Sequence, residues 1–164
     1  MSAQTSYNFA IPLGVAGSLF DISPYRIDSR LNGERTAGKL KFGMGAVRGA
    51  NPGFDVVVPV AASAPALFEG VTMTGFTNEQ NMGGEVIVHP MQTVGVLRWG
   101  KCWVRVPDGV TPEYGQRLYL IRNGENAGMF TNVATGNIEI HGRFVGGLGT
   151  GSVAPVEIFN QSNE

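Results

Sequence analysis

The sequence predicts an all-β protein: an antiparallel β-sandwich or barrel-like domain with an extended N-terminal arm. Glycine accounts for 24 of the 164 residues, about twice its average share of ~7%, and a glycine inside a helix costs about 1 kcal/mol relative to alanine. These glycines are spread along the whole chain. Between them lie short segments rich in β-branched and aromatic residues, at the spacing typical of sandwiches and barrels. No amphipathic helical pattern interrupts the series.

The sequence predicts that residues 1–39 form the extended arm and that residues 40–164 form one β-sandwich or barrel domain. The first segment has no sustained period of 2 or 3.6 and mixes turn formers, such as Pro12 and Pro24, with isolated apolar side chains. Such a segment buries too little surface by itself to offset an ordering cost of about 1–2 kcal/mol per residue. It must therefore lie against a neighbouring protein or against its own domain. For residues 20–31 both alternatives stay open.

Within the domain, ten short segments predict strands, each bounded by Gly, Pro or Asn. They are residues 40–47, 54–60, 67–74, 85–89, 93–99, 101–106, 116–122, 128–132, 137–145 and 153–159. Where the fifth and sixth segments meet, Gly100 predicts either a sharp hairpin or a glycine kink. Asn123-Gly124 predicts a second turn.

The arm carries the side chains that we expect to make much of the contact with other proteins. A large apolar side chain contributes about 1.5–3 kcal/mol when it is fully buried, and here several follow one another without a periodic core of their own. The predicted interface residues are Tyr7, Phe9, Ile11, Pro12, Leu13, Phe20 and Tyr25, with Arg26 and Arg30 pairing at the rim. Charged residues make up 15% of the chain, against a typical ~25%, so the surface is unusually neutral.

Composition excludes several classes of partner. The 12 Lys and Arg residues against 13 Asp and Glu residues leave a formal charge of -1, so there is no basic field to hold nucleic acid. No segment approaches the ~18 apolar residues of a transmembrane helix, and residues 1–20 lack the basic start of a signal peptide. We therefore expect no nucleic-acid partner, no membrane partner and synthesis inside a cell.

Metal and cofactor sites are also not predicted. A lone cysteine, Cys102, with two distant histidines cannot complete a four-ligand zinc site. The glycine-rich runs FGMGAVRG and GGLGTG precede no helical pattern. A phosphate loop requires a helix N-terminus at that place, so we interpret both runs as turns.

Catalysis by His89, His141 or Cys102 is the enzymatic alternative. Sequence distance alone does not exclude a triad, because its members need only be close in space. However, the chain contains no G-x-S-x-G elbow and no H-E-x-x-H motif, and Cys102 in the segment KCWVRV is typical of a small buried apolar residue. We predict no catalytic residue. A small β-barrel enzyme would instead require two of these groups within hydrogen-bond reach in one pocket.

An ordered series of short motifs extends over nearly the whole chain. These motifs are Tyr7 with Pro12, GVAG at residues 14–17 with Asp21, Phe42-Gly43 with Val47-Arg48-Gly49, Phe68-Glu69-Gly70-Val71, Val96-Leu97-Arg98 with Gly100 and Trp103-Val104, Gly115 with Leu118-Tyr119, and Gly142-Arg143-Phe144 with Val156-Glu157-Ile158. In this order the chain resembles the structural cement, or head decoration, proteins of tailed bacteriophages. It departs from them at residues 70–74, GVTMT, where the family usually has "G-V-A-V-H".

The resemblance implies a non-enzymatic protein that binds the outer surface of an assembled capsid across capsomer boundaries and stabilises it. The implied partners are the major capsid protein and further copies of the chain, as a homodimer or a homotrimer. The implied location is the outside of the virion, after synthesis in the host cytoplasm. A tail or receptor-binding structural module of a virion is the second interpretation.

Overall fold

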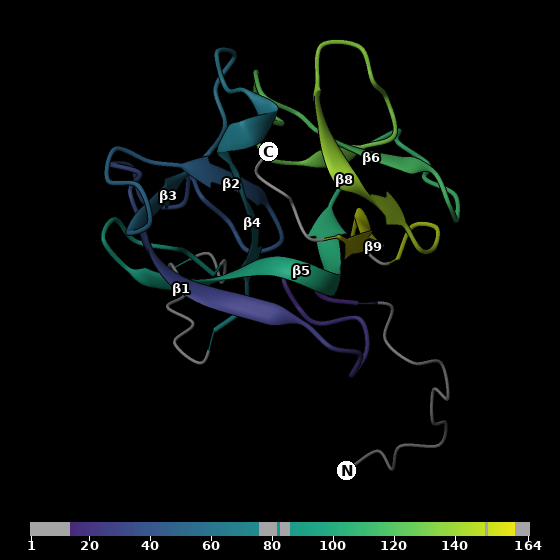
Figure 1. Ribbon diagram of the computed structural model, residues 1–164, viewed down its shortest axis with the longest axis horizontal. Coiled ribbons are helices and arrows are strands. Elements are labelled where there is room, and N and C mark those ends of the chain that lie inside the picture. The colour runs from purple at the N-terminus through teal and green to yellow at the C-terminus, as the bar shows by residue number, and fades with distance from the viewer. Residues whose placement is uncertain (1–13, 76–81, 83–85, 150, 160–164) are drawn as a thin grey trace.

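The computed structural model describes residues 14–75, 82, 86–149 and 151–159, and it confirms the all-β fold class (Figure 1). The strands are β1 (Arg26–Asn32), β2 (Gly45–Arg48), β3 (Asp55–Val57), β4 (Phe68–Met73), β5 (Thr93–Arg105), β6 (Arg117–Leu120), β7 (Phe130–Thr131), β8 (Ile138–Phe144) and β9 (Val153–Ile158). Among the described residues, the helical content is one short 3-10 turn, η1 (Pro65–Leu67).

Five strands close into a barrel. β1 pairs in parallel with β3 and antiparallel with β5, while β3, β2, β4 and β5 pair with one another in that order, all antiparallel. Closure leaves these strands without the unpaired edge that an open sheet exposes. The barrel occupies the lower left of Figure 1, and the strands β9, β8 and β6 stand beside it.

Strand β5 joins the barrel to a second, outer sheet. Residues up to Trp99 pair with β1 and β4, and residues 100–105 pair with β9, which β8, β6 and β7 follow. The hairpin alternative at Gly100 is therefore wrong, because the chain continues as one strand through this position. Gly100 adopts a φ of 127°, which side-chain-bearing residues rarely adopt, exactly where β5 changes partners. Of the strand predicted at 85–89, the described residues 86–89 belong to none of the named strands.

Two apolar clusters follow from the alternation of side chains along the strands. One cluster contains Ala46, Val56, Val94 and Val96 on alternate positions of the barrel strands. The other contains residues whose side chains point to the opposite face of the barrel strands, such as Val71 and Leu97, together with residues of the outer sheet. The rings of Phe68 and Phe130 meet edge to face at 6.5 Å in this second cluster, so it joins the barrel to the outer sheet.

The described part of the segment expected as an arm contributes a strand to the barrel. Of residues 20–31, for which the sequence left both alternatives open, residues 26–31 form β1 together with Asn32. Before it, Gly17 N donates to Trp103 O at 2.8 Å, Trp103 N donates to Ser18 O at 2.9 Å, and Leu19 bridges to Cys102. Residues 17–20 therefore cover the edge of residues 100–105 that faces away from β9. Residues 1–13 of the predicted arm lie outside the described part of the chain.

Candidate interaction surface

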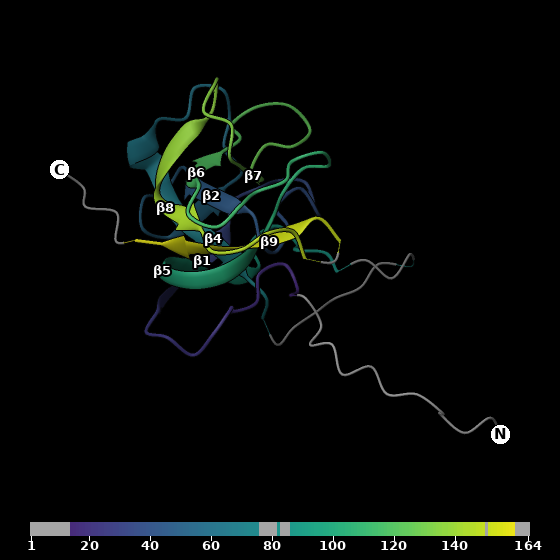
Figure 2. The same cartoon turned by 90° about the vertical axis from the view of Figure 1, so that its right-hand side faces the viewer.

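Exposed apolar side chains concentrate on one stretch of the chain. Single exposed apolar residues are common on soluble proteins, but neighbouring groups of them mark interaction sites. Five such side chains, which we call the N-terminal apolar surface, are Val15, Phe20, Ile22, Tyr25 and Ile27. Ile22 is the most exposed of them, at 101%. Figures 1 and 2 show this purple segment as a loop below β5 and β1.

Specific contacts hold this loop in one shape. The ring of Phe20 lies 5.6 Å from the ring of Trp103 in β5. The carboxylate of Asp21 accepts hydrogen bonds from Ser23 N and from Lys101 Nζ, both at 3.0 Å. The hydrogen bonds from Ser23, and after them the one from Lys101, lower the pKa of Asp21, which keeps this carboxylate charged. A loop fixed before binding loses less conformational entropy when a partner covers it.

A pocket of about 560 Å³ adjoins the N-terminal apolar surface. Its apolar walls include Pro24 from the loop, Trp99 from β5, and Ile158 and Phe159 from the end of β9. The surface therefore combines projecting side chains with a hollow that can receive a large side chain of a partner, as pockets at the centre of protein interfaces do.

The structure separates the predicted interface residues. Phe20 and Tyr25 lie on the N-terminal apolar surface, and Arg26 is exposed beside Asp28, with Nε 3.1 Å from Oδ1. Arg30, expected at the rim, has a side chain that is 18% exposed and lies in a group of partly buried charges around the buried Glu69. The predicted residues Tyr7, Phe9, Ile11, Pro12 and Leu13 lie outside the described residues.

Val15, Ile22 and Ile27 were not predicted as interface residues. Ile22 and Ile27 each stand between two polar residues, and Val15 lies between two glycines in the segment GVAG, so local hydrophobicity gives little signal for them. Their exposure follows from the path of the chain beside β5.

A group of charged side chains, here called the charge cluster, closes one end of the barrel. Glu69 in β4 lies beside the guanidinium groups of Arg98 in β5, Arg48 in β2 (Nε to Oε1, 3.3 Å) and Arg30 in β1 (Nη2 to Oε2, 3.9 Å). Asp28 accepts a further bond from Arg30. Only 7% of the Glu69 side chain is exposed. The cluster therefore connects four of the five barrel strands through one buried carboxylate.

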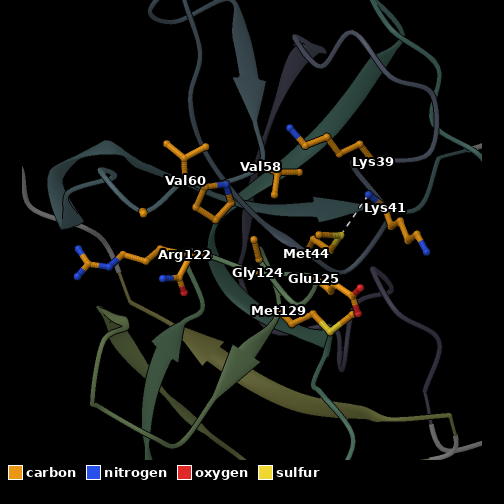
Figure 3. A pocket seen from close by; sticks show the side chains of 13 residues that line it. Lys39, Lys41, Met44, Val58, Val60, Arg122, Gly124, Glu125 and Met129 are labelled. Atoms are coloured by element: carbon orange, nitrogen blue, oxygen red, sulfur yellow. Dashed lines mark hydrogen bonds between the residues drawn. The ribbon is translucent and has the colours of Figure 1, made fainter.

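A second pocket, of about 470 Å³, lies between the barrel and the loop that joins β6 to β7 (Figure 3). Met44, Val58 and Met129 form apolar parts of its wall, and Lys41 and Arg122 supply positive charge. Its lining contains one carboxylate, that of Glu125, and neither histidine nor cysteine. These residues do not provide a nucleophile with an adjacent base, nor a pair of carboxylates for acid–base catalysis.

The three groups of the enzymatic alternative occupy different environments. Cys102 is fully buried in the core beside the outer sheet, and burial raises the pKa of its thiol, so the reactive thiolate is disfavoured. His141 lies in β8 with its ring 5.3 Å from that of Phe159, while His89 is exposed in the turn before β5. Within the described ranges, no group of three or more His, Cys, Asp or Glu residues is placed to hold a metal ion. Those ranges also contain no helix with the length and hydropathy needed to cross a bilayer.

Comparison with known proteins identifies relatives of this fold. The family model described as "Structural cement protein (E217 gp24/Pam3 gp6)" matches residues 3–159. Among solved structures, a chain from "The capsid of Myoviridae Phage XM1" matches with a TM-score of 0.72 and 19% sequence identity, over 98% of this chain and 99% of that chain. A search of curated proteins found no match. The structural match shows that the two chains share a fold over almost their whole length.

Proposed function

Because the chain belongs to the structural cement protein family, we propose that it binds the outer surface of an assembled phage capsid, across the boundaries between capsomers, and stabilises the shell. The family resemblance stated from the sequence is confirmed, and with it a structural role in a phage capsid. The match over residues 3–159 is the observation that carries the proposal. The similarity of the fold to a chain from a phage capsid structure supports it.

The N-terminal apolar surface is the part of the described chain that suits this role best. Each large apolar side chain that becomes fully buried contributes about 1.5–3 kcal/mol. If the covering surface exists only where capsomers meet, the protein binds the closed shell and not free capsid subunits. Binding to one state alone stabilises that state by mass action.

The proposed partners are the major capsid protein and further copies of this chain. A protein on a two-fold or three-fold axis of a shell matches that axis as a dimer or a trimer. We propose that the chain acts as a homodimer or homotrimer on the outside of the virion and is made in the host cytoplasm. The neutral surface, with 15% charged residues, agrees with a protein that uses much of its surface for contacts.

Replacing Ile22 with aspartate should weaken binding to capsids by tenfold or more. The side chain is 101% exposed, so the substitution leaves the fold intact but places a charge in an apolar contact, where loss of a central residue costs about 2 kcal/mol or more. The measurement is co-sedimentation of purified protein with shells assembled without it. The matched control is Val133→Asp, an exposed valine in the loop between β7 and β8, which should bind as the unchanged protein does.

Equal binding of the Ile22→Asp protein would contradict a role for the N-terminal apolar surface. Failure of the unchanged protein to bind shells would contradict the proposed function itself. Imaging that places the chain on tails, and not on shells, would support the tail or receptor-binding module instead.

Removing residues 1–13 tests the proposed arm with Tyr7, Phe9, Ile11, Pro12 and Leu13. We expect the shortened protein to fold, because the backbone hydrogen bonds to β5 among the described residues begin at Gly17, and to lose most of its affinity for shells. Thermal unfolding and co-sedimentation measure the two properties separately. A shortened protein that fails to fold would show that these residues belong to the core, and unchanged binding would remove the arm from the interface.

A further inference from the structure

A turn before β5 holds a methionine in a conformation that normally belongs to glycine. Gln92 N donates to His89 O at 3.2 Å, which closes a turn with Pro90 and Met91 at its centre. Met91 has a φ of 60°, in the left-handed region that this position of a type II turn requires and that glycine or asparagine usually supplies. A residue with a Cβ atom is less stable there by about 1–2 kcal/mol. Such strain at a bulky residue is a reason to look for a function of its side chain.

The Met91 side chain lies in solvent and does not pack in the core. It is 68% exposed, so it contributes little to the core. Its backbone is fixed all the same, because Met91 N donates to Asn32 O at 2.9 Å and Asn32 N donates to Gln92 O at 2.9 Å. The turn is thus tied to the last residue of β1 by two hydrogen bonds. The fold supports a strained backbone that projects a flexible apolar side chain into solvent.

A second large apolar side chain lies at the same end of β1, on the edge of β1 that faces β3. Phe54 is exposed and precedes β3, and Leu31 N donates to Phe54 O at 2.8 Å. Its turn is closed by Phe54 N donating to Asn51 O and by Asn51 N donating to the Asp55 carboxylate. Because β3 and β5 flank β1, the backbones of Phe54 and Met91 are separated by about two strand spacings, roughly 10 Å. We call these two side chains the β1-end knobs.

We propose that the β1-end knobs form a second contact with the capsid protein, inserting into an apolar recess on its outer surface. This inference rests on the proposed function. β1 begins directly after Tyr25 of the N-terminal apolar surface, and its last two residues bond to the backbones of Phe54 and Met91. Its seven residues span roughly 23 Å at about 3.3 Å per residue. The barrel therefore holds two apolar contacts at a fixed separation, one at each end of the same strand.

The size of the knobs favours a capsid subunit over a second copy of this chain as the occupant. Two side chains of this kind offer on the order of 300 Å², whereas a stable interface between two proteins needs about 800 Å² from each partner. The knobs alone are too small to hold a dimer. They add affinity when another part of the same rigid body is already bound, because the second contact then forms within one complex.

The test uses the full chain with Met91→Gly and, separately, Phe54→Ser. Glycine suits the left-handed turn, so the Met91→Gly protein should unfold at the same temperature as the unchanged protein or a higher one, yet bind shells about tenfold more weakly. Phe54→Ser should weaken binding similarly without lowering the unfolding temperature. Ser152→Gly is the matched control: Ser152 is the other described residue with a Cβ atom and a positive φ, 56°, and it lies away from β1. This control should bind as the unchanged protein does.

Three results would overturn the inference or its premise. Wild-type affinity for both knob variants, with Ile22→Asp still weakened, would overturn the second contact and leave the proposed function standing. A change in the sedimenting mass of the free Met91→Gly protein would show that the knobs meet a second copy and not the capsid. Absence of binding by the unchanged protein would overturn the proposed function, on which the inference rests.

Discussion

Replacing Gly70 with alanine is expected to lower the free energy of unfolding by about 4 kcal/mol or more, which is a large fraction of the ~5–15 kcal/mol that stabilises a typical domain. Gly70 lies inside β4 with a φ of 148°, which L-residues rarely adopt. An added Cβ atom would lie 2.2 Å from Leu97 O and 2.8 Å from Val96 Cγ1. The nearer atom belongs to the backbone of the paired strand β5, so it cannot rotate away. Relief would require β4 and β5 to separate within the closed barrel.

The measurement for Gly70→Ala is chemical unfolding followed by circular dichroism, or soluble yield where the variant does not fold. Gly109→Ala is the matched control, because Gly109 also has a positive φ, 84°, but open space where the Cβ would lie. The control should lose only about 1–2 kcal/mol, which is what a left-handed backbone costs a residue with a Cβ atom. Equal losses for both variants would show that the barrel relaxes around the new methyl group.

Replacing Glu69 with glutamine should lower the free energy of unfolding by about 3–5 kcal/mol. The substitution keeps the shape of the side chain but removes the charge that faces Arg30, Arg48 and Arg98. Only 7% of the Glu69 side chain is exposed, so water does not replace the lost carboxylate. Arg30 Nε is already buried without a hydrogen-bond partner, and the cluster therefore has no spare acceptor to offer.

The matched control for Glu69→Gln is Glu139→Gln. Glu139 pairs with Arg117 on the surface at 2.9 Å, with side chains 58% and 74% exposed, and such pairs contribute about 0–1 kcal/mol. Urea unfolding at one pH and salt concentration compares the two variants. A loss for Glu69→Gln no larger than that of the control would mean that solvent reaches the arginines and that the charge cluster does not support the barrel.

These two residues explain one of the sequence motifs. In Phe68-Glu69-Gly70-Val71, Phe68 and Val71 pack in the core beside the outer sheet. Glu69 is the extra residue of a bulge in the pairing of β2 with β4, because Ala46 pairs with Gly70 and Val47 pairs with Phe68. Gly70 allows β5 to approach. The strand character of this segment could be predicted from its composition. The requirement for glycine and glutamate could not, because it arises from strands far away in the sequence.

The sequence predicted the fold class because its strands are short, β-branched and bounded by glycine, and this pattern is local. It did not single out β1, Arg26–Asn32, since the strand has no apolar alternation: Asp28 and Arg30 alternate with Ser29 and Leu31. In the barrel, Asp28 and Arg30 meet the charge cluster, so the usual apolar face is absent there. The continuous path of β5 was also undetermined, because a glycine between two strand-like segments fits a turn as well as a change of partner.

The candidate site was predictable to a similar extent. Phe20 and Tyr25 were predicted as interface residues because large apolar residues in a segment without periodicity need a surface to cover them, and the structure shows that both are exposed. Ile22 and Met91 are exposed because of the course that the backbone takes around them. That course depends on contacts with distant strands, so the neighbouring residues in the sequence do not reveal it. Arg30 illustrates the opposite case, since a polar residue in an irregular segment became a buried contact once the barrel closed.

The sharing of β5 between two sheets has a consequence for how the molecule opens. Its residues up to Trp99 are bonded to β1 and β4, and residues 100–105 are bonded to β9 and flanked by residues 17–20. Fraying of the outer sheet would therefore pull on a strand that is also one wall of the barrel. We therefore expect the barrel, the outer sheet and the N-terminal loop to unfold as one cooperative unit. The β5 amide hydrogens should exchange slowly with solvent, because their exchange requires that whole unit to unfold.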